Sequence, residues 1–263
     1  NDIIIDYANH SFTNGNVTVK EGDWISIDGT SGKVFLGQNE VVKPAMDENF
    51  STFMKWVDSY RDMKVRTNAD TPEDAQRARE FGAEGIGLCR TEHMFFGEER
   101  IKAIRKMIIS ETEDARRDAL MELLPYQKND FKEIFKAMKG LPVTVRLLDP
   151  PLHEFIPSEK EEIAKVAEDL GIPVEKFSQI ARSLKEFNPM LGHRGCRLGI
   201  TYPEITEMQT RAIIEAAIEL QKENIDVVPE IMVPLIGTQQ EFVSQKMTID
   251  KTAEKVFEET GIT

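Results

Sequence analysis

The stretch Val143-Thr144-Val145-Arg146-Leu147-Leu148 decides the fold prediction. Apolar side chains occupy every second position from Val143, which is the two-residue period of a β-strand. Arg146 lies on the opposite face of the same strand, where a permanently charged guanidinium is unusual beside so many apolar residues. We therefore predict a buried strand that directs Arg146 toward a site inside the fold.

Strand-like and helix-like segments alternate on both sides of this stretch. The expected strands are residues 65–68, 85–89, 143–148, a short one within 192–199, and 227–235. The expected helices are 71–82, one that begins at a capping box in 110–113 and ends at Pro125, then 159–170, 175–187, one containing 208–220, and 248–259. Such alternation predicts an α/β fold with parallel strands, either a doubly wound sheet or a β/α barrel.

The first part of the chain has a different pattern. Residues 1 to about 38 read as short β-strands, with a hairpin over 24–36 that turns at Gly29–Gly32. This segment is too small to bury a core alone, so we expect it to be the tail of a larger domain or to pack on something else. Apolar residues at helical spacing from Phe50 to Val57 predict a connecting helix that reaches about Arg61.

Composition excludes several classes of protein. The chain has 263 residues, of which 40% are hydrophobic and 30% charged, and this excludes a disordered chain. Its net charge of −13 argues against nucleic acid or anionic lipid as the main partner, and no segment has the length and apolarity of a membrane span. Two cysteines, Cys89 and Cys196, suit a cytoplasmic location. A start at Asn1, inside an apparent strand, predicts an excised fragment.

Three arginines are the candidate binding residues: Arg90, Arg146 and Arg194. They stand at strand exits or in the glycine-rich stretch 192–199, and the carboxyl ends of barrel strands are where active sites lie. Convergent arginines in an acidic protein indicate a small polyanionic ligand. The alternative is that each pairs with a nearby acid, such as Arg90 with Glu92, and only ties loops together.

Other polar residues carry weaker signals. We expect a structural role for the three histidines near these arginines, because their spacing matches no helical zinc site: His93, His153 and His193. Cys89 is expected to be a buried structural thiol. Three residues at strand ends could reach a metal or ligand, although pairing with arginine is the favoured interpretation: Asn68, Asp149 and Glu230. The glycines in 192–199 match no nucleotide-binding fingerprint.

Three longer runs resemble a known family. They are Gly85–Phe96 (GIGLCRTEHMFF), Val145–Phe155 (VRLLDPPLHEF) and Asn188–Leu198 (NPMLGHRGCRL). These runs are similar to signatures of the PEP-utilising enzymes, a group that includes the pyruvate, phosphate dikinases, phosphoenolpyruvate synthase and enzyme I of the sugar phosphotransferase system. The first two runs point to the dikinase branch, and the resemblance covers essentially the whole chain.

The resemblance implies a reversible reaction in which ATP, pyruvate and phosphate give AMP, phosphoenolpyruvate and diphosphate. In this family ATP phosphorylates a histidine on a swivelling domain, which then moves to a magnesium-dependent (β/α)8 TIM barrel that binds pyruvate and phosphoenolpyruvate. By motif match, Arg90 and Arg146 would grip the transferring phosphoryl group and substrate oxygens, with Arg194 as a third anion contact.

The resemblance also implies what this chain lacks. Residues 1–40 would be the tail of the phosphohistidine domain, 41–62 a linker helix, and 63–263 the first five or so βα units of the barrel. The phosphohistidine, the nucleotide-binding domain, the magnesium ligands and the catalytic acid would all lie elsewhere in the parent chain, the last two beyond Thr263. We thus expect no catalytic, cofactor-binding or metal-binding residue here, an inactive fragment and a homo-oligomer. The alternatives are phosphoenolpyruvate synthase, an enzyme I-like phosphotransferase, or a non-catalytic anion-binding fragment.

Overall fold

The computed structural model describes residues 3–41 and 47–262. The chain divides into two compact units, residues 1–62 and 63–263, which are described separately. Part of the predicted linker, residues 42–46, lies outside the described residues, as do Asn1 and Thr263. No helix in the described ranges has the length and apolarity needed to cross a bilayer.

The first unit contains two small antiparallel sheets and one helix. Strands β1 (Ile3–Asp6), β2 (Ser11–Asn14) and β3 (Val17–Lys20) form one sheet, and β4 (Ile25–Asp28) and β5 (Lys33–Leu36) form the predicted hairpin. Helix α1 (Glu48–Tyr60) begins at Asp47, whose side chain accepts a hydrogen bond from the amide of Phe50. Among the described residues of this unit, Val19 is the one buried hydrophobic side chain.

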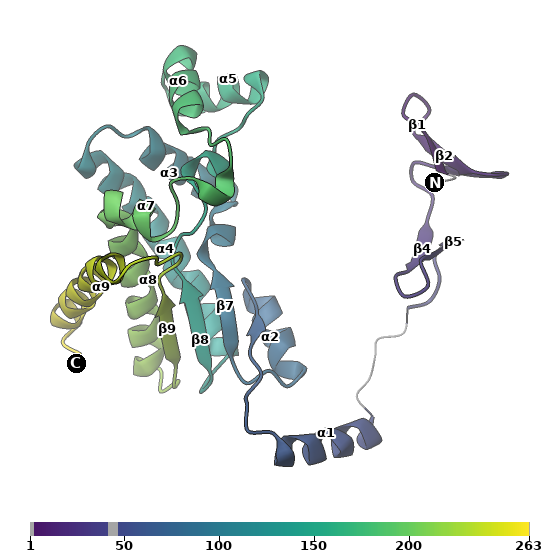
Figure 1. Ribbon diagram of the computed structural model, residues 1–263, viewed down its shortest axis with the longest axis horizontal. Helices are drawn as coiled ribbons and strands as arrows, with labels where there is room; N and C mark the ends of the chain where they lie inside the picture. The colour runs from purple at the N-terminus through teal and green to yellow at the C-terminus, as the bar shows by residue number, and fades with distance from the viewer. Residues whose placement is uncertain (1–2, 42–46, 263) are drawn as a thin grey trace. The chain divides into compact units, whose positions relative to one another are not determined.

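The second unit is built on a parallel sheet. Its strands are β6 (Thr67–Asn68), β7 (Ile86–Arg90), β8 (Pro142–Arg146) and β9 (Val228–Met232). They lie side by side in chain order, β6-β7-β8-β9, and each neighbouring pair is parallel (Figure 1). The predicted α/β class with parallel strands is confirmed.

Helices connect and cover these strands. Their bounds are α2 (Pro72–Glu80), η1 (Thr91–Phe95), α3 (Glu98–Ile109), α4 (Glu113–Ala137), η2 (Leu152–Phe155), α5 (Lys160–Asp169), α6 (Val174–Leu184), η3 (Pro189–Leu191), α7 (Cys196–Thr201), α8 (Pro203–Lys222) and α9 (Gln239–Thr260). Helix α2 has the predicted N-cap, since the side chain of Thr71 accepts a hydrogen bond from the amide of Asp74. Helices α4 and α8 lie behind the sheet in Figure 1. Phe131 of α4, Val145 of β8 and Ile213 of α8 are fully buried in the core that results.

Two sequence predictions need correction, and one helix was not predicted. Helix α4 does not end at Pro125 but continues to Ala137. Proline removes one backbone hydrogen bond from the helix. Burial of Leu123 and Phe131 on either side stabilises the helix despite this loss. The stretch 192–199 forms no strand; it contains a loop and the start of α7, so the described part of this unit has four strands rather than five. Helix α3 (Glu98–Ile109) was not predicted at all.

The sheet has a polar face as well as a buried one. Arg66, just before β6, donates to Glu230 on β9, with Nη1 to Oε2 at 2.5 Å and Nη2 to Oε1 at 3.2 Å. The hydroxyl of Thr144 on β8 donates to the same carboxylate at 2.7 Å. Hydrogen bonds from Arg66 and Thr144 lower the pKa of Glu230. This carboxylate therefore ties three chain segments together while it is ionised.

We predict that Glu230→Gln lowers the free energy of unfolding at neutral pH by less than about 1 kcal/mol, because the pair is partly exposed. The folded-state pKa lies below the ordinary value of 4.5, so this stabilisation is present above pH 4.5 and disappears as the pH falls further. Urea unfolding of both proteins at several pH values should show the difference shrinking below that point. A difference that is the same at every pH would contradict the account.

Candidate functional site

The parallel strands bring Arg90 and Arg146 to one edge of the sheet. Each is the last residue of its strand, and the two are direct neighbours in the β7–β8 register. Parallel strands end at a common edge, which explains why residues 56 positions apart in sequence lie side by side. Asp70 follows β6 at the same edge, because the amide of Ala69 still donates to the carbonyl of Leu88 at 3.2 Å.

Arg90 is held by Asp70. Its backbone amide donates to Oδ1 of Asp70 at 2.6 Å, and its Nη1 donates to Oδ2 at 2.9 Å. His93 Nδ1 lies 2.8 Å from the same Oδ2 atom. Arg90 does pair with an acid, as the sequence-based alternative has it, but the acid is Asp70 and not Glu92. The signal that could have identified Asp70 is an acidic residue directly after a strand that neighbours β7.

Arg146 is held from two sides. Its Nη2 donates to Oε1 of Glu92, and its Nη1 pairs with Oδ2 of Asp149 at 2.9 Å. Asp149 also accepts hydrogen bonds from Arg194, with Nη2 to Oδ2 at 2.8 Å and Nε to Oδ1 at 3.2 Å. The side chain of Asp149 is 4% exposed, so one buried carboxylate joins two guanidinium groups. The favoured interpretation of Asp149 as an arginine partner is confirmed.

The backbone around Asp149 is fixed independently of these ion pairs. The amide of Gly195 donates to the carbonyl of Asp149 at 2.9 Å, which sets the position of the adjacent Arg194. Gly195 has φ = 62°, and a Cβ there would lie 3.0 Å from Cβ of Leu235, so glycine is required. On the other side, the amide of Leu148 donates to Oε1 of the buried Gln209 at 2.8 Å.

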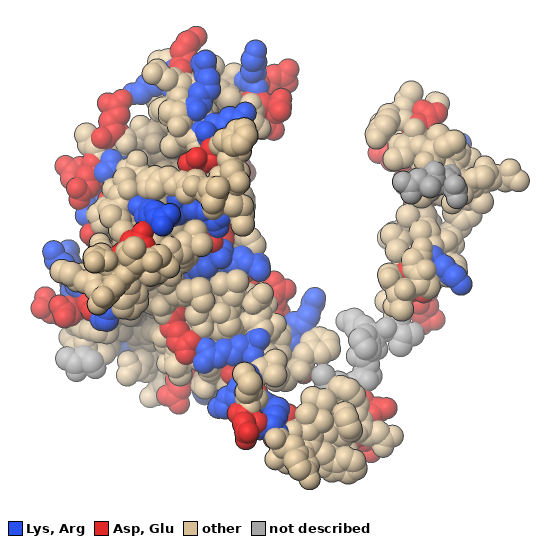
Figure 2. All heavy atoms as spheres, viewed as in Figure 1, with Lys and Arg blue, Asp and Glu red and all other residues tan. Residues whose placement is uncertain are grey.

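All three predicted arginines therefore lie in what we call the strand-end cluster: Arg90, Arg146, Arg194, Asp70, Glu92, Asp149 and His93. Asp70 pairs with Arg90 and His93, while Arg146 pairs with Glu92 and shares Asp149 with Arg194, and the β7–β8 register places these two sets side by side. The cluster contains three guanidinium groups and three carboxylates, so its net charge is zero when His93 is neutral. Figure 2 shows blue and red side chains intermingled on the viewed face around the upper ends of β7 and β8. Two buried atoms of the cluster lack a hydrogen-bond partner in the described part of the chain, Nε of Arg146 and Oε2 of Glu92. Arg146 therefore has one buried guanidinium donor without a protein acceptor among the described residues.

The other residues that the sequence analysis singled out lie outside this cluster or have structural roles. His193 Nε2 lies 3.1 Å from the carbonyl of Arg197 and 3.0 Å from the hydroxyl of Thr201. Glu230 pairs with Arg66, as described above, and Asn68 is exposed in β6. Burial, followed by the charges of nearby carboxylates, raises the pKa of the Cys89 thiol far above its ordinary value. Cys89 is therefore a structural thiol, as predicted.

The residues present do not fit a magnesium site. Within the described ranges, no group of three or more His, Cys, Asp or Glu side chains could hold a metal ion. The carboxylates of the strand-end cluster are already bound to guanidinium groups, and an adjacent positive charge disfavours a cation.

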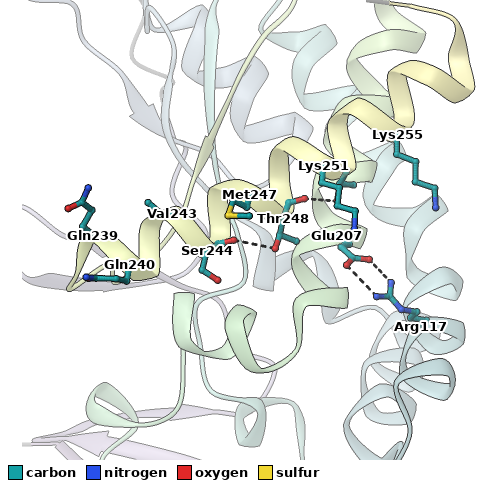
Figure 3. A pocket seen from close by; sticks show the side chains of 11 residues that line it. Arg117, Glu207, Gln239, Gln240, Val243, Ser244, Met247, Thr248, Lys251 and Lys255 are labelled. Carbon is teal, nitrogen blue, oxygen red and sulfur yellow. Dashed lines mark hydrogen bonds and ion pairs between the residues drawn. The ribbon is translucent and has the colours of Figure 1, made fainter.

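A hollow of about 1160 Å3 lies away from the strand-end cluster. It lies along α9, where Val243, Met247 and Lys251 line it together with the ion pair of Arg117 and Glu207 (Figure 3). Arg117 is neutralised by Glu207, and the other positive residues of the lining are Lys251 and Lys255 on α9. Size therefore does not identify the binding site here.

Comparison with known proteins identifies the relatives of this chain. Residues 44–263 match the family model described as PEP-utilising enzyme, PEP-binding domain. The chain is 55% identical over 251 residues to pyruvate, phosphate dikinase 1, chloroplastic, of Arabidopsis thaliana, covering 95% of this chain and 26% of that protein. It is 52% identical over 261 residues to the Clostridium symbiosum enzyme of the same name and 53% identical over 261 residues to that of Rhizobium meliloti. Those matches cover 99% of this chain and 30% and 29% of the relatives.

These matches confirm the resemblance that the three sequence runs predicted. The chain spans less than a third of the length of these curated relatives.

We predict that Asp149→Asn lowers the free energy of unfolding by about 3–5 kcal/mol, because it leaves two largely buried guanidinium groups without their shared carboxylate. Guanidinium chloride unfolding, followed by circular dichroism, measures this loss. Asp250→Asn is the matched control, since Asp250 forms an exposed pair with Lys246 and should change stability by no more than about 0.5 kcal/mol. Equal effects of the two substitutions would contradict the central role of Asp149.

Proposed function

The chain belongs to the PEP-utilising enzymes, and on that premise we propose that it supplies part of the phosphoenolpyruvate and pyruvate site of a pyruvate, phosphate dikinase. The observation that carries the proposal is the adjacency of Arg90 and Arg146 at the carboxyl edge of the parallel sheet, with Arg194 joined to Arg146 through Asp149. Relatives bearing the dikinase name at 52–55% identity support the choice of activity.

The three arginines bind and orient the substrate in this proposal. Phosphoryl transfer needs positioning and charge neutralisation more than covalent participation by the protein. A guanidinium presents planar paired donors that match phosphate and carboxylate oxygens. Each arginine is held by at least one carboxylate or backbone contact, so the donors are oriented before the substrate arrives, and little ordering is needed on binding.

We propose that the sheet is part of a β/α barrel. Two features support it. The strand order follows the chain without the reversal that marks a doubly wound sheet. Strands β6 and β9 each have one edge that no other described strand pairs with, and Val243 and Met247 on α9 are exposed, where a further βα unit would pack.

Other parts of the reaction are assigned outside the described residues. The strand-end carboxylates do not fit Mg2+, so in this proposal its ligands, the proton donor to the enolate and the ATP-dependent step belong to other parts of a longer enzyme. Bound Mg2+ would supply charge neutralisation at the phosphoryl group. The chain by itself is accordingly proposed to have no dikinase turnover.

The same reasoning extends to organisation. We propose that residues 1–40 are the tail of a phosphohistidine domain, that 41–62 link it to the barrel, and that the protein is a cytoplasmic homo-oligomer. The single buried hydrophobic residue among the described positions of the first unit supports its being part of a larger domain. Free, buried Cys89 and Cys196 suit a reducing compartment.

Titration of the chain with phosphoenolpyruvate, followed by the 31P chemical shift of the ligand, tests the proposed site. We predict that Arg90→Met weakens binding at least tenfold, because charge-assisted hydrogen bonds to the anion are lost. This variant should fold, since Asp70 keeps its contacts with His93 and with the backbone amide of residue 90.

Arg211→Met is the matched control, because Arg211 pairs with Glu215 and Glu259 on α8 and α9, away from the strand ends. It should bind phosphoenolpyruvate as the unchanged chain does. Equal affinity of Arg90→Met and the unchanged chain for phosphoenolpyruvate would contradict the proposed site.

A further inference from the structure

A second hollow lies in a part of the protein that the proposed function does not use. Helices α5 and α6, with the segment that leads into them, form a lobe over residues 156–185, which Figure 1 shows at the top of the second unit. The lobe has a small core of its own, formed by Val166, Ala167 and Phe177. The hollow beside it has a volume of about 510 Å3, which lies in the usual range for small-molecule sites.

The lining of this hollow combines an apolar floor with positive charge. Ile156, Ile163 and Ala181 provide apolar surface, while Lys160 at the start of α5 and Lys185 just after α6 are cationic. Arg182 is the third cation, and no Asp or Glu is among the described residues that line the hollow. The charged residues of the lining are therefore all positive, whereas the chain as a whole has a net charge of −13.

These cations also lack carboxylate partners. None of the three forms an ion pair with another residue in the part of the chain that the structure describes, and only Nε of Arg182 has a hydrogen bond, to the carbonyl of Ser178 at 3.2 Å. Two acids of the lobe, Glu162 and Asp169, interact with Arg105 instead: burial lowers the pKa of Arg105, and the charges of these two carboxylates offset part of that effect.

The hollow also has an unsatisfied polar atom in its wall. His153 lines it, and Nδ1 of this residue is buried without a hydrogen-bond partner among the described residues. A buried polar atom that lacks a partner costs stability, and such atoms mark places where water or a ligand completes the hydrogen bonding. The hydroxyls of Ser158 and Ser178 add further polar groups to the same lining.

We propose that this hollow binds a small amphipathic anion: a compact apolar body, of the size of one aromatic ring, that carries a terminal phosphate or carboxylate. The body would lie on Ile156, Ile163 and Ala181, and the anionic group would be bound by Lys160, Arg182 and Lys185. The site is separate from the strand-end cluster, with which it shares no residue, and it does not depend on the proposed function.

Titration of the whole chain with phenyl phosphate, followed by isothermal calorimetry, tests the inference. Benzoate carries the alternative anionic group, whereas inorganic phosphate and benzyl alcohol each carry half of the proposed ligand. We expect phenyl phosphate or benzoate to bind at least tenfold more tightly than either half. The double variant R182E/K185E should weaken that binding at least tenfold, and Ala181→Phe, which fills the hollow without changing charge, should abolish it.

Two controls separate this site from the rest of the protein. Lys165→Glu, on α5 but outside the lining, should change the affinity less than twofold. Arg90→Met should leave it unchanged, so failure here and failure of the strand-end site are distinguishable. Binding that survives both R182E/K185E and Ala181→Phe, or inorganic phosphate that binds as tightly as phenyl phosphate, would overturn the proposal. Binding lost in Arg90→Met would overturn it as well, by placing the ligand at the strand ends.

Discussion

The arrangement at the strand ends depends on one buried carboxylate. Asp149 forms an ion pair with Arg146 and accepts hydrogen bonds from Arg194, and its side chain is almost fully enclosed. Two guanidinium groups that approach so closely repel one another strongly in a medium of low dielectric constant, and a shared negative charge reverses the sign of that interaction. Asp149 thereby converts an unfavourable pair of cations into a rigid element at the edge of the sheet.

This neutralisation has a consequence for function. To bind an anion, an acidic protein must hold several positive groups in fixed orientations. Those groups must also not repel one another when no ligand is bound. The strand-end cluster meets both requirements, because Asp70, Glu92 and Asp149 hold the arginines while the side chains of Arg90, Arg146 and Arg194 stay partly exposed. Preorganisation of this kind reduces the ordering cost of binding. The same logic distinguishes the lobe hollow, where Arg182 and its neighbours have no such carboxylates.

Patterns within short segments allowed much of the fold to be predicted. Features that depend on contacts between residues distant in sequence could not be predicted. The α/β alternation and the common edge that brings Arg90 and Arg146 together follow from patterns within short segments. Pro125 misled the prediction because burial of the flanking helix, a tertiary effect, outweighs one missing hydrogen bond. Ion-pair partners were the hardest to predict: Glu92 lies two residues from Arg90 in sequence but pairs with Arg146, 54 residues away. Strand neighbours bring Arg90 to Asp70 and Arg146 to Glu92, whereas Asp149, three residues from Arg146, is a partner that sequence proximity does indicate.

A crystal structure of the chain with phosphoenolpyruvate bound would test the central claim most directly. The account predicts phosphate oxygens within hydrogen-bond distance of the guanidinium groups of Arg90 and Arg146, with the ion pairs of Asp149 to Arg146 and Arg194 retained. Ligand density away from the carboxyl ends of β7 and β8, with neither arginine in contact, would contradict it.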